Sequence, residues 1–195
     1  MSWSAEFVEG VRHITDPGGI DHMVFLLALC AIYELKEWKN VLLLATAFTI
    51  GHSVTLFAAG FDIVVLSGSM IEMAIPITIF ITALSNTGVV WRNSTALDSS
   101  KLRYIMAIIF GMIHGFGFSN YFRMMRIENE SILEPLLMFN IGVEAGQVLI
   151  VTAIMLISAL LKGMFSIKQS VWILFVSGMA AGIALLLWSN LILEA

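Results

Sequence analysis

The feature that most constrains this chain is a series of six apolar stretches, each long enough, or nearly so, to cross the ~30 Å hydrocarbon core of a bilayer. Soluble domains are about 45–50% apolar and about 25% charged, whereas this sequence is 59% hydrophobic and 12% charged. We therefore predict an all-α, polytopic membrane protein, a compact bundle of six transmembrane helices that forms a single domain over residues 1–195. The predicted spans are residues 20–35, 40–61, 70–91, 102–122, 132–161 and 171–193.

The first 19 residues lack the basic and apolar regions of a cleaved signal peptide. Apolar residues nevertheless recur at helical spacing, with charged residues between them. This pattern predicts a short amphipathic helix on the membrane surface, although a frayed tail would fit as well. The apolar positions are Trp3, Phe7, Val8 and Val11.

Basic residues are distributed unequally between the two sets of loops. With the N-terminus outside, the outer segments hold only Arg12, Arg123 and Arg126 of the 10 basic residues. The positive-inside rule then places both termini outside the membrane. The inner loops hold the others: Lys36, Lys39, Arg92, Lys101, Arg103, Lys162 and Lys168.

Titratable side chains lie inside or at the mouth of the apolar stretches, where a polar group normally has a function and a partner. In the orientation above, all of them fall in the outer half of the membrane, which predicts one polar pocket open to the outside. Imidazole and carboxylate suit divalent transition metals, so the sequence predicts a metal site. Its candidate ligands are Asp21, His22, His52, His114 and Glu144, with Glu72 and His13 in support.

Asp21 and His22 are adjacent, so on a regular helix they point about 100° apart. We expect Asp21 to orient a histidine unless the turn after Gly18 and Gly19 is irregular. A capped helix start with a solvated His22 is the plainer alternative. The lone Cys30 is expected to be a small buried hydrophobe.

Polar neighbours share helical faces with two of the candidates. His52 could instead be a hydrogen-bonded packing residue between helices, and Glu144 a protonated side chain bonded to its neighbours. The third predicted span carries a thin polar trail in its inner half, either part of a pathway or simple interhelical bonding. The neighbours are Thr49 and Ser53 beside His52, and Asn140 and Gln147 beside Glu144; the trail is Thr78, Thr82, Ser85 and Asn86.

Pairs of glycines four residues apart allow helices to pack closely. Three such pairs occur in the last three predicted spans, which favours a compact bundle. They are Gly111/Gly115, Gly142/Gly146 and Gly178/Gly182.

Four stretches together resemble the HupE/UreJ family of small bacterial inner-membrane proteins. They are G-I-D-H-M-V-F (19–25), A-F-T-I-G-H-S-V-T-L (47–56), F-G-M-I-H-G-F-G-F (110–118) and F-N-I-G-V-E-A-G-Q (139–147). The better-studied branch has a His-Pro pair shortly before Gly-x-Asp-His. Here Thr15 and Asp16 stand in that region and the nearest histidine is His13, so the chain resembles the second branch more closely.

The resemblance implies a nickel or cobalt permease of the bacterial inner membrane, with a metal role for Asp21, His22, His52, His114 and Glu144. The ion would be Ni, Co or Zn, and the other partners would be the lipid bilayer and either a second copy or a metalloenzyme-maturation protein, with no nucleic acid. No nucleotide-binding motif is present. An intramembrane zinc-dependent hydrolase with the same ligands is the main alternative, and an assembly protein is a third.

Overall fold

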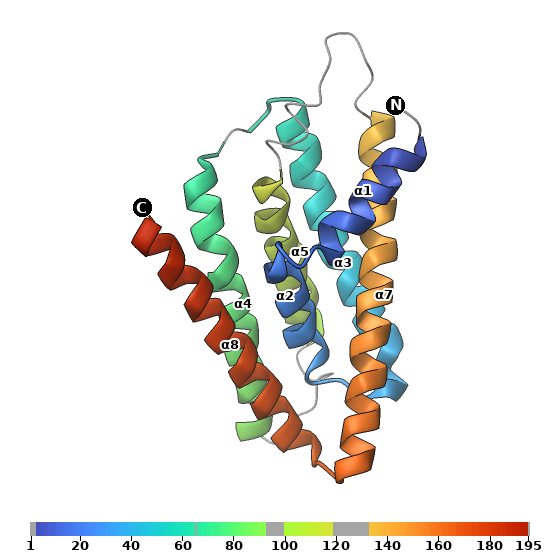
Figure 1. The fold of residues 1–195 in the computed structure, drawn as a ribbon, viewed down its shortest axis with the longest axis vertical. Helices are drawn as coiled ribbons and strands as arrows, with labels where there is room; N and C mark the ends of the chain where they lie inside the picture. Colours follow the sequence, from blue (N-terminus) through green and yellow to red (C-terminus); the bar gives the residue numbers. More distant parts are fainter. Residues whose placement is uncertain (1–2, 65, 93–99, 119–132, 195) are drawn as a thin grey trace.

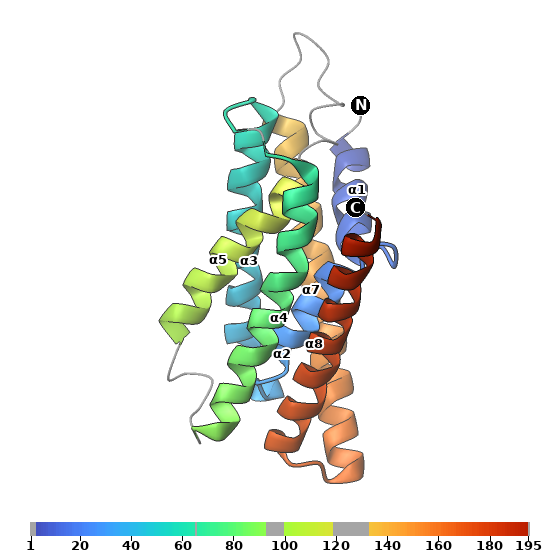
Figure 2. The same cartoon turned by 90° about the vertical axis from the view of Figure 1, so that its left-hand side faces the viewer.

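The computed structural model describes residues 3–64, 66–92, 100–118 and 133–194, and its helices run roughly along one common direction (Figures 1 and 2). Within these residues there is no strand, so the predicted all-α class is confirmed. The helices are α1 (Trp3–Thr15), α2 (Ile20–Cys30), the short 3-10 helix η1 (Leu35–Glu37), α3 (Trp38–Gly60), α4 (Gly68–Trp91), α5 (Ser100–Gly117), α7 (Leu133–Phe165) and α8 (Gln169–Glu194).

Four segments are long and apolar enough to cross a membrane, namely Leu35–Gly60, Gly68–Trp91, Leu133–Phe165 and Gln169–Leu193. They coincide with four of the predicted spans to within a few residues. The predicted span 102–122 corresponds to α5, which is helical over Ser100–Gly117, and residues 119–122 lie outside the described part of the chain. The count of six crossings stays a prediction.

The first predicted span differs most from the structure. Helix α2 has 11 residues and is only about 16 Å long, and it ends at Cys30 instead of residue 35. Ala31, Ile32 and Tyr33 form a turn although all three are buried. Hydropathy alone missed this helix end, because a buried turn built from apolar residues looks like a continuing span.

The predicted short N-terminal helix is present as α1, so the frayed tail is wrong, and the helix packs against α7 as part of the bundle. Its buried side is formed by Glu6, Gly10 and Ile14, one residue per turn, and this side packs against α7. A side chain at Gly10 would collide with the Phe139 carbonyl, and one at Gly142 with the Phe7 carbonyl. The contact is made by backbone at small residues, so the spacing of large apolar residues did not reveal it.

Helices α1 and α2 are stacked end to end with a break between them (Figures 1 and 2). Asp16 and Pro17 make the break: the Asp16 carbonyl accepts from the Gly19 amide (3.0 Å) and its side chain from the Gly18 amide (2.9 Å). The residue before a proline is disfavoured in a helix. The 13 residues of α1 and 11 of α2 together rise about 36 Å, which matches one crossing in length.

Helices α3 and α5 form a second close seam in the bundle. A Cβ atom at Gly51 would collide with the Ile108 carbonyl, one at Gly111 with the Phe48 carbonyl, and one at Gly115 with Thr55. The predicted close packing through Gly111/Gly115 and Gly142/Gly146 is therefore confirmed. Gly178 and Gly182 have nothing within 4 Å of an added Cβ, so this pair makes no close contact within the described chain.

The two ends of the bundle differ in charge. The α2–α3 and α7–α8 connections, the C-terminus of α4 and the N-terminus of α5 lie at the lower end in Figure 1, while both chain ends lie toward the other. All seven basic residues assigned to inner loops belong to these lower segments. Arg12 lies on α1, and Arg123 and Arg126 lie outside the described residues.

Candidate metal centre

All four histidines of the chain meet around His22, at the break between α1 and α2. The His22 ring centroid lies 4.8 Å from that of His13, 5.0 Å from that of His114 and 6.2 Å from that of His52. Helices α1, α2, α3 and α5 each contribute one of these rings. Side chains separated by up to about 100 residues therefore converge on one point.

The ligand atoms form two overlapping groups among the described residues. His13, His22 and His52 make up one, and Asp21, His22 and His114 the other; within each group the atoms lie within 4.8 Å of one another. That separation allows a single ion to be bound by one atom from each residue after small side-chain rotations, since metal–nitrogen bonds are about 2.0–2.1 Å. His22 belongs to both groups.

Five buried ring nitrogens of this cluster have no hydrogen-bond partner. His22, His52 and His114 are 4%, 0% and 1% exposed. Buried polar atoms are nearly always paired, so several unpaired nitrogens this close together could hold a cation. They are His13 Nε2, His22 Nε2, His52 Nδ1, His52 Nε2 and His114 Nδ1.

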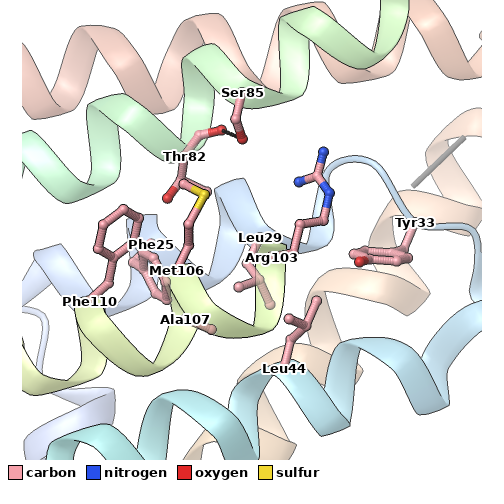
Figure 3. A pocket seen from close by; sticks show the side chains of 10 residues that line it. All are labelled: Phe25, Leu29, Tyr33, Leu44, Thr82, Ser85, Arg103, Met106, Ala107 and Phe110. Atoms are coloured by element: carbon pink, nitrogen blue, oxygen red, sulfur yellow. Dashed lines mark hydrogen bonds between the residues drawn. The ribbon is translucent and has the colours of Figure 1, made fainter. Parts of the chain in front are cut away.

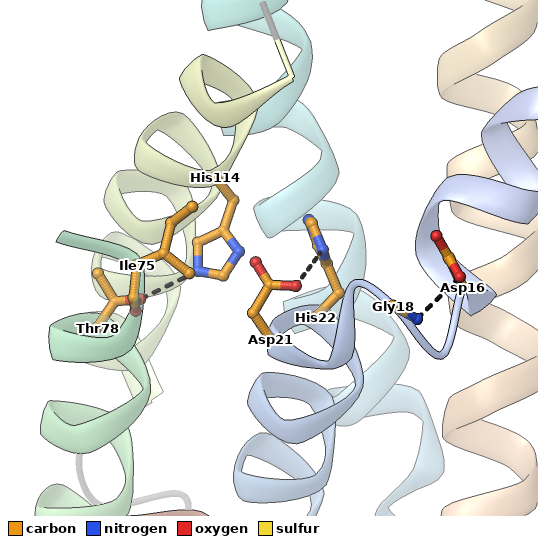
Figure 4. Close-up of polar contacts among 7 residues, drawn as sticks. All are labelled: Asp16, Gly18, Asp21, His22, Ile75, Thr78 and His114. Carbon is orange, nitrogen blue, oxygen red and sulfur yellow. Dashed lines mark hydrogen bonds and ion pairs between the residues drawn. The ribbon is translucent and has the colours of Figure 1, made fainter. Parts of the chain in front are cut away.

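Asp21 holds the central imidazole in place (Figure 4). Its Oδ1 lies 3.2 Å from His22 Nδ1. Because a carboxylate can only accept, His22 Nδ1 carries the hydrogen and donates it to Asp21, which leaves Nε2 of the neutral ring with a free lone pair. The carboxyl group stands between the His22 and His114 rings in the figure. This contact is the one expected if Asp21 orients a histidine.

Asp21 and His22 also lie in one ligand group, although they are neighbours in the first turn of α2. The non-helical backbone is at Gly19, before the helix begins, with φ of −101° and ψ of 54°. The solvated His22 that the plainer alternative expected is not found, because that ring is buried.

Aromatic rings enclose the cluster. Phe48 and Phe25 lie 5.1 Å and 5.6 Å from His114, and Phe118 and Phe139 lie 4.0 Å and 5.6 Å from His13, between ring centroids. Apolar walls exclude water and strengthen electrostatic interactions with a bound ion.

Glu144 belongs to neither ligand group. Its Oε1 lies 2.5 Å from the Thr46 hydroxyl, while its Oε2 is buried without a partner. Thr46 lies six residues before His52 on α3, about 9 Å along the axis. The carboxyl thus occupies a separate position between α3 and α7.

The other supporting residues are divided between the two positions. The Thr49 hydroxyl lies 2.9 Å from Gln147 Oε1, which links α3 to α7 between the cluster and Glu144. Asn140 donates to the Leu136 carbonyl and leaves its Oδ1 buried and unpartnered. The Ser53 hydroxyl donates to the Thr49 carbonyl.

Glu72 is exposed on α4, and it is in neither ligand group. The sequence gives the depth of Glu72 along its span, but it does not give the side of the helix on which the carboxyl lies. His13, in contrast, was expected only in support, and the structure brings it into a group. The sequence could not show this, because the break between α1 and α2 brings the His13 ring to 4.8 Å from the His22 ring.

The polar trail on α4 leads from the cluster to a small inner pocket (Figure 3). Thr82 donates to the Thr78 carbonyl (2.8 Å) and Ser85 to that of Thr82 (2.9 Å). Asn86 donates to the Ala28 carbonyl (2.7 Å) and accepts from Arg103 (3.3 Å). Beside Arg103 the pocket of about 20 Å³ has room for about one water molecule. Bonding between helices accounts for the Asn86 end of the trail.

A family model described as HupE / UreJ protein matches residues 2–191 of the chain. Neither the curated proteins nor the solved structures contain a significant match to it.

Proposed function

The chain belongs to the HupE/UreJ family, and from that premise and the histidine cluster we propose that it is a permease for divalent transition metals of the nickel and cobalt type. The ion would enter from the outer side of a bacterial inner membrane, with both chain termini outside. It would exchange water for imidazole and carboxylate and then move inward. The lipid bilayer and the ion are the partners required by this activity.

The overlap of the two ligand groups carries this proposal. Because His22 is common to both, an ion can pass from His13 and His52 to Asp21 and His114 without losing every ligand at once. Conduction requires binding that is favourable enough to admit the ion and divided over enough sites to release it. One rigid site would retain the ion instead.

The broken α1–α2 pair supports the same activity. Irregular backbone at membrane depth is tolerated where it lines a cavity, and discontinuous helices are common at transporter binding sites. Here the break lies beside three of the candidate ligands: His13, Asp21 and His22.

Imidazole-rich sites with one carboxylate accept Ni²⁺, Co²⁺ and Zn²⁺. We propose nickel or cobalt because the family is associated with hydrogenase and urease maturation. A purified sample analysed for all metals would identify the ion.

An intramembrane zinc hydrolase is the second candidate. Each group offers three protein ligands, as catalytic zinc sites do when they leave a fourth position for water. Such an enzyme would bind one equivalent of Zn²⁺ tightly and transport none.

Uptake of labelled metal into proteoliposomes separates the two candidates. We expect the wild-type protein to transport Ni²⁺ or Co²⁺, and His52→Ala and His114→Ala to reduce uptake to background, because each removes a ligand from a different group. Glu72→Gln serves as the control and should transport normally, since that carboxyl is exposed. Tight Zn²⁺ binding without flux would contradict the permease and favour the hydrolase.

We further propose that Glu144 acts on the way out rather than in the ligand groups, because it contacts Thr46 and keeps one buried oxygen unpaired. Glu144→Gln is expected to bind metal with less than about a threefold change in Kd, a difference of under ~0.7 kcal/mol, and to transport several-fold more slowly. Equilibrium dialysis and vesicle uptake measure the two quantities. A large loss of affinity would instead return Glu144 to the binding site.

A further inference from the structure

Thr78, a residue of the polar trail on α4, contacts the candidate ligand His114. We propose that Thr78 is a positioning residue: its hydroxyl fixes the His114 proton on Nε2 and so presents Nδ1 as the nitrogen that binds the ion. This inference rests on the proposed function only for the identity of the ligand, because the proton position can be measured without metal.

The hydroxyl of Thr78 makes two contacts but has a single proton. Its oxygen lies 2.7 Å from the Ile75 carbonyl and 3.1 Å from His114 Nε2 (Figure 4). A carbonyl oxygen can only accept, so the proton of Thr78 has to point at Ile75. Otherwise two oxygens would face each other at 2.7 Å with no hydrogen between them.

With its proton committed to Ile75, the Thr78 oxygen can only accept from the ring. His114 Nε2 then carries the hydrogen, and in a neutral imidazole the other nitrogen is unprotonated. That nitrogen, Nδ1, is buried without a partner, and His114 is in the group formed with Asp21 and His22. Thr78 is itself only 2% exposed, so water does not compete for the contact.

The arrangement repeats the one at His22 with the nitrogens exchanged. Asp21 holds the proton of His22 on Nδ1 and frees Nε2, whereas Thr78 holds that of His114 on Nε2 and frees Nδ1. Partners of this kind fix both the tautomer and the ring orientation of metal-binding histidines. Neither ring nitrogen of His52 has a hydrogen-bond partner of this kind.

The proton position is tested on the metal-free protein in liposomes, with ¹⁵N-labelled histidine. The chain has only 4 histidines, so solid-state NMR can assign the His114 signal by its loss in His114→Gln. We expect His114 protonated at Nε2 in the wild type and in Thr78→Ser, and a mixed or reversed tautomer in Thr78→Val. A wild-type His114 protonated at Nδ1 would overturn the inference.

Metal affinity provides the second test. Loss of such an outer partner typically weakens binding about 10–100-fold, so we expect that loss for Thr78→Val and near-normal binding for Thr78→Ser. Thr82→Val is the matched control, because Thr82 is also buried and donates only to the Thr78 carbonyl. If the Thr78→Val and Thr82→Val proteins bind metal with equal affinity, the inference is wrong.

The two proposals fail separately. If wild-type vesicles bind metal without transporting it, the permease is wrong and the role of Thr78 stands on the NMR signal and the affinities. If transport is found while His114 carries its proton on Nδ1, the permease stands and the role of Thr78 is wrong.

Discussion

Replacing His22 by alanine is expected to abolish high-affinity metal binding and transport together, the largest functional effect of any single substitution here. His22 is the only residue present in both ligand groups, so its loss leaves two ligands in each. Loss of a residue that only hydrogen-bonds a metal ligand weakens metal binding about 10–100-fold. Loss of a ligand that both groups share should therefore weaken it at least ~100-fold. Isothermal titration with Ni²⁺ or Co²⁺ in detergent measures the change.

His13→Ala is the matched comparison for His22→Ala. It removes an imidazole from one group only, and the Asp21, His22 and His114 set remains intact. We therefore expect weaker but measurable binding. If both variants lost the same metal affinity, the ion would not use the two groups independently. The proposed passage of the ion from one group to the other would then be wrong.

Valine in place of Gly111 is expected to produce the largest loss of stability. A Cβ atom there collides with the carbonyl of Phe48, and backbone atoms on both sides leave no flexible side chain to move away. Overpacking costs about 1–3 kcal/mol and occasionally more, or about 2–12 °C in Tm for a chain of this size. We expect a loss at or beyond the upper end, measured by thermal unfolding in detergent.

Gly178→Val is the control for Gly111→Val. It introduces the same side chain in the same glycine motif, but nothing lies within 4 Å of its Cβ position. Its Tm should stay close to that of the wild type. If both variants lost the same amount of Tm, the valine side chain in the helix would explain the loss by itself. The close contact between α3 and α5 would then not be the cause.

The Gly111 variant also connects stability to the site. Helices α3 and α5 carry His52 and His114, and the seam between them sets the separation of these rings. Any Gly111→Val protein that remains folded is therefore expected to bind metal more weakly than Gly178→Val.

Several parts of the site were predictable because they depend on residue chemistry. Buried histidines and a carboxylate in apolar helices point to a cation wherever the helices lie, and Asp21, His22, His52 and His114 do converge. Glu72 and Glu144 share that chemistry and a similar depth, yet both lie outside the ligand groups. Depth follows from position along a span, whereas convergence depends on the rotation of each helix about its axis.

By itself, the sequence determined the class of fold, the extents of α3, α4, α7 and α8 to within a few residues, and the chemistry of the candidate ligands. These properties follow from local composition, since length and hydropathy decide what can cross a bilayer. Only the tertiary structure decided that α1 joins the bundle through Gly10, that the break at Pro17 brings His13 over His22, and that Thr78 faces His114. Each of these depends on which backbone surfaces approach most closely, and small or absent side chains at those surfaces leave no periodic trace in the sequence.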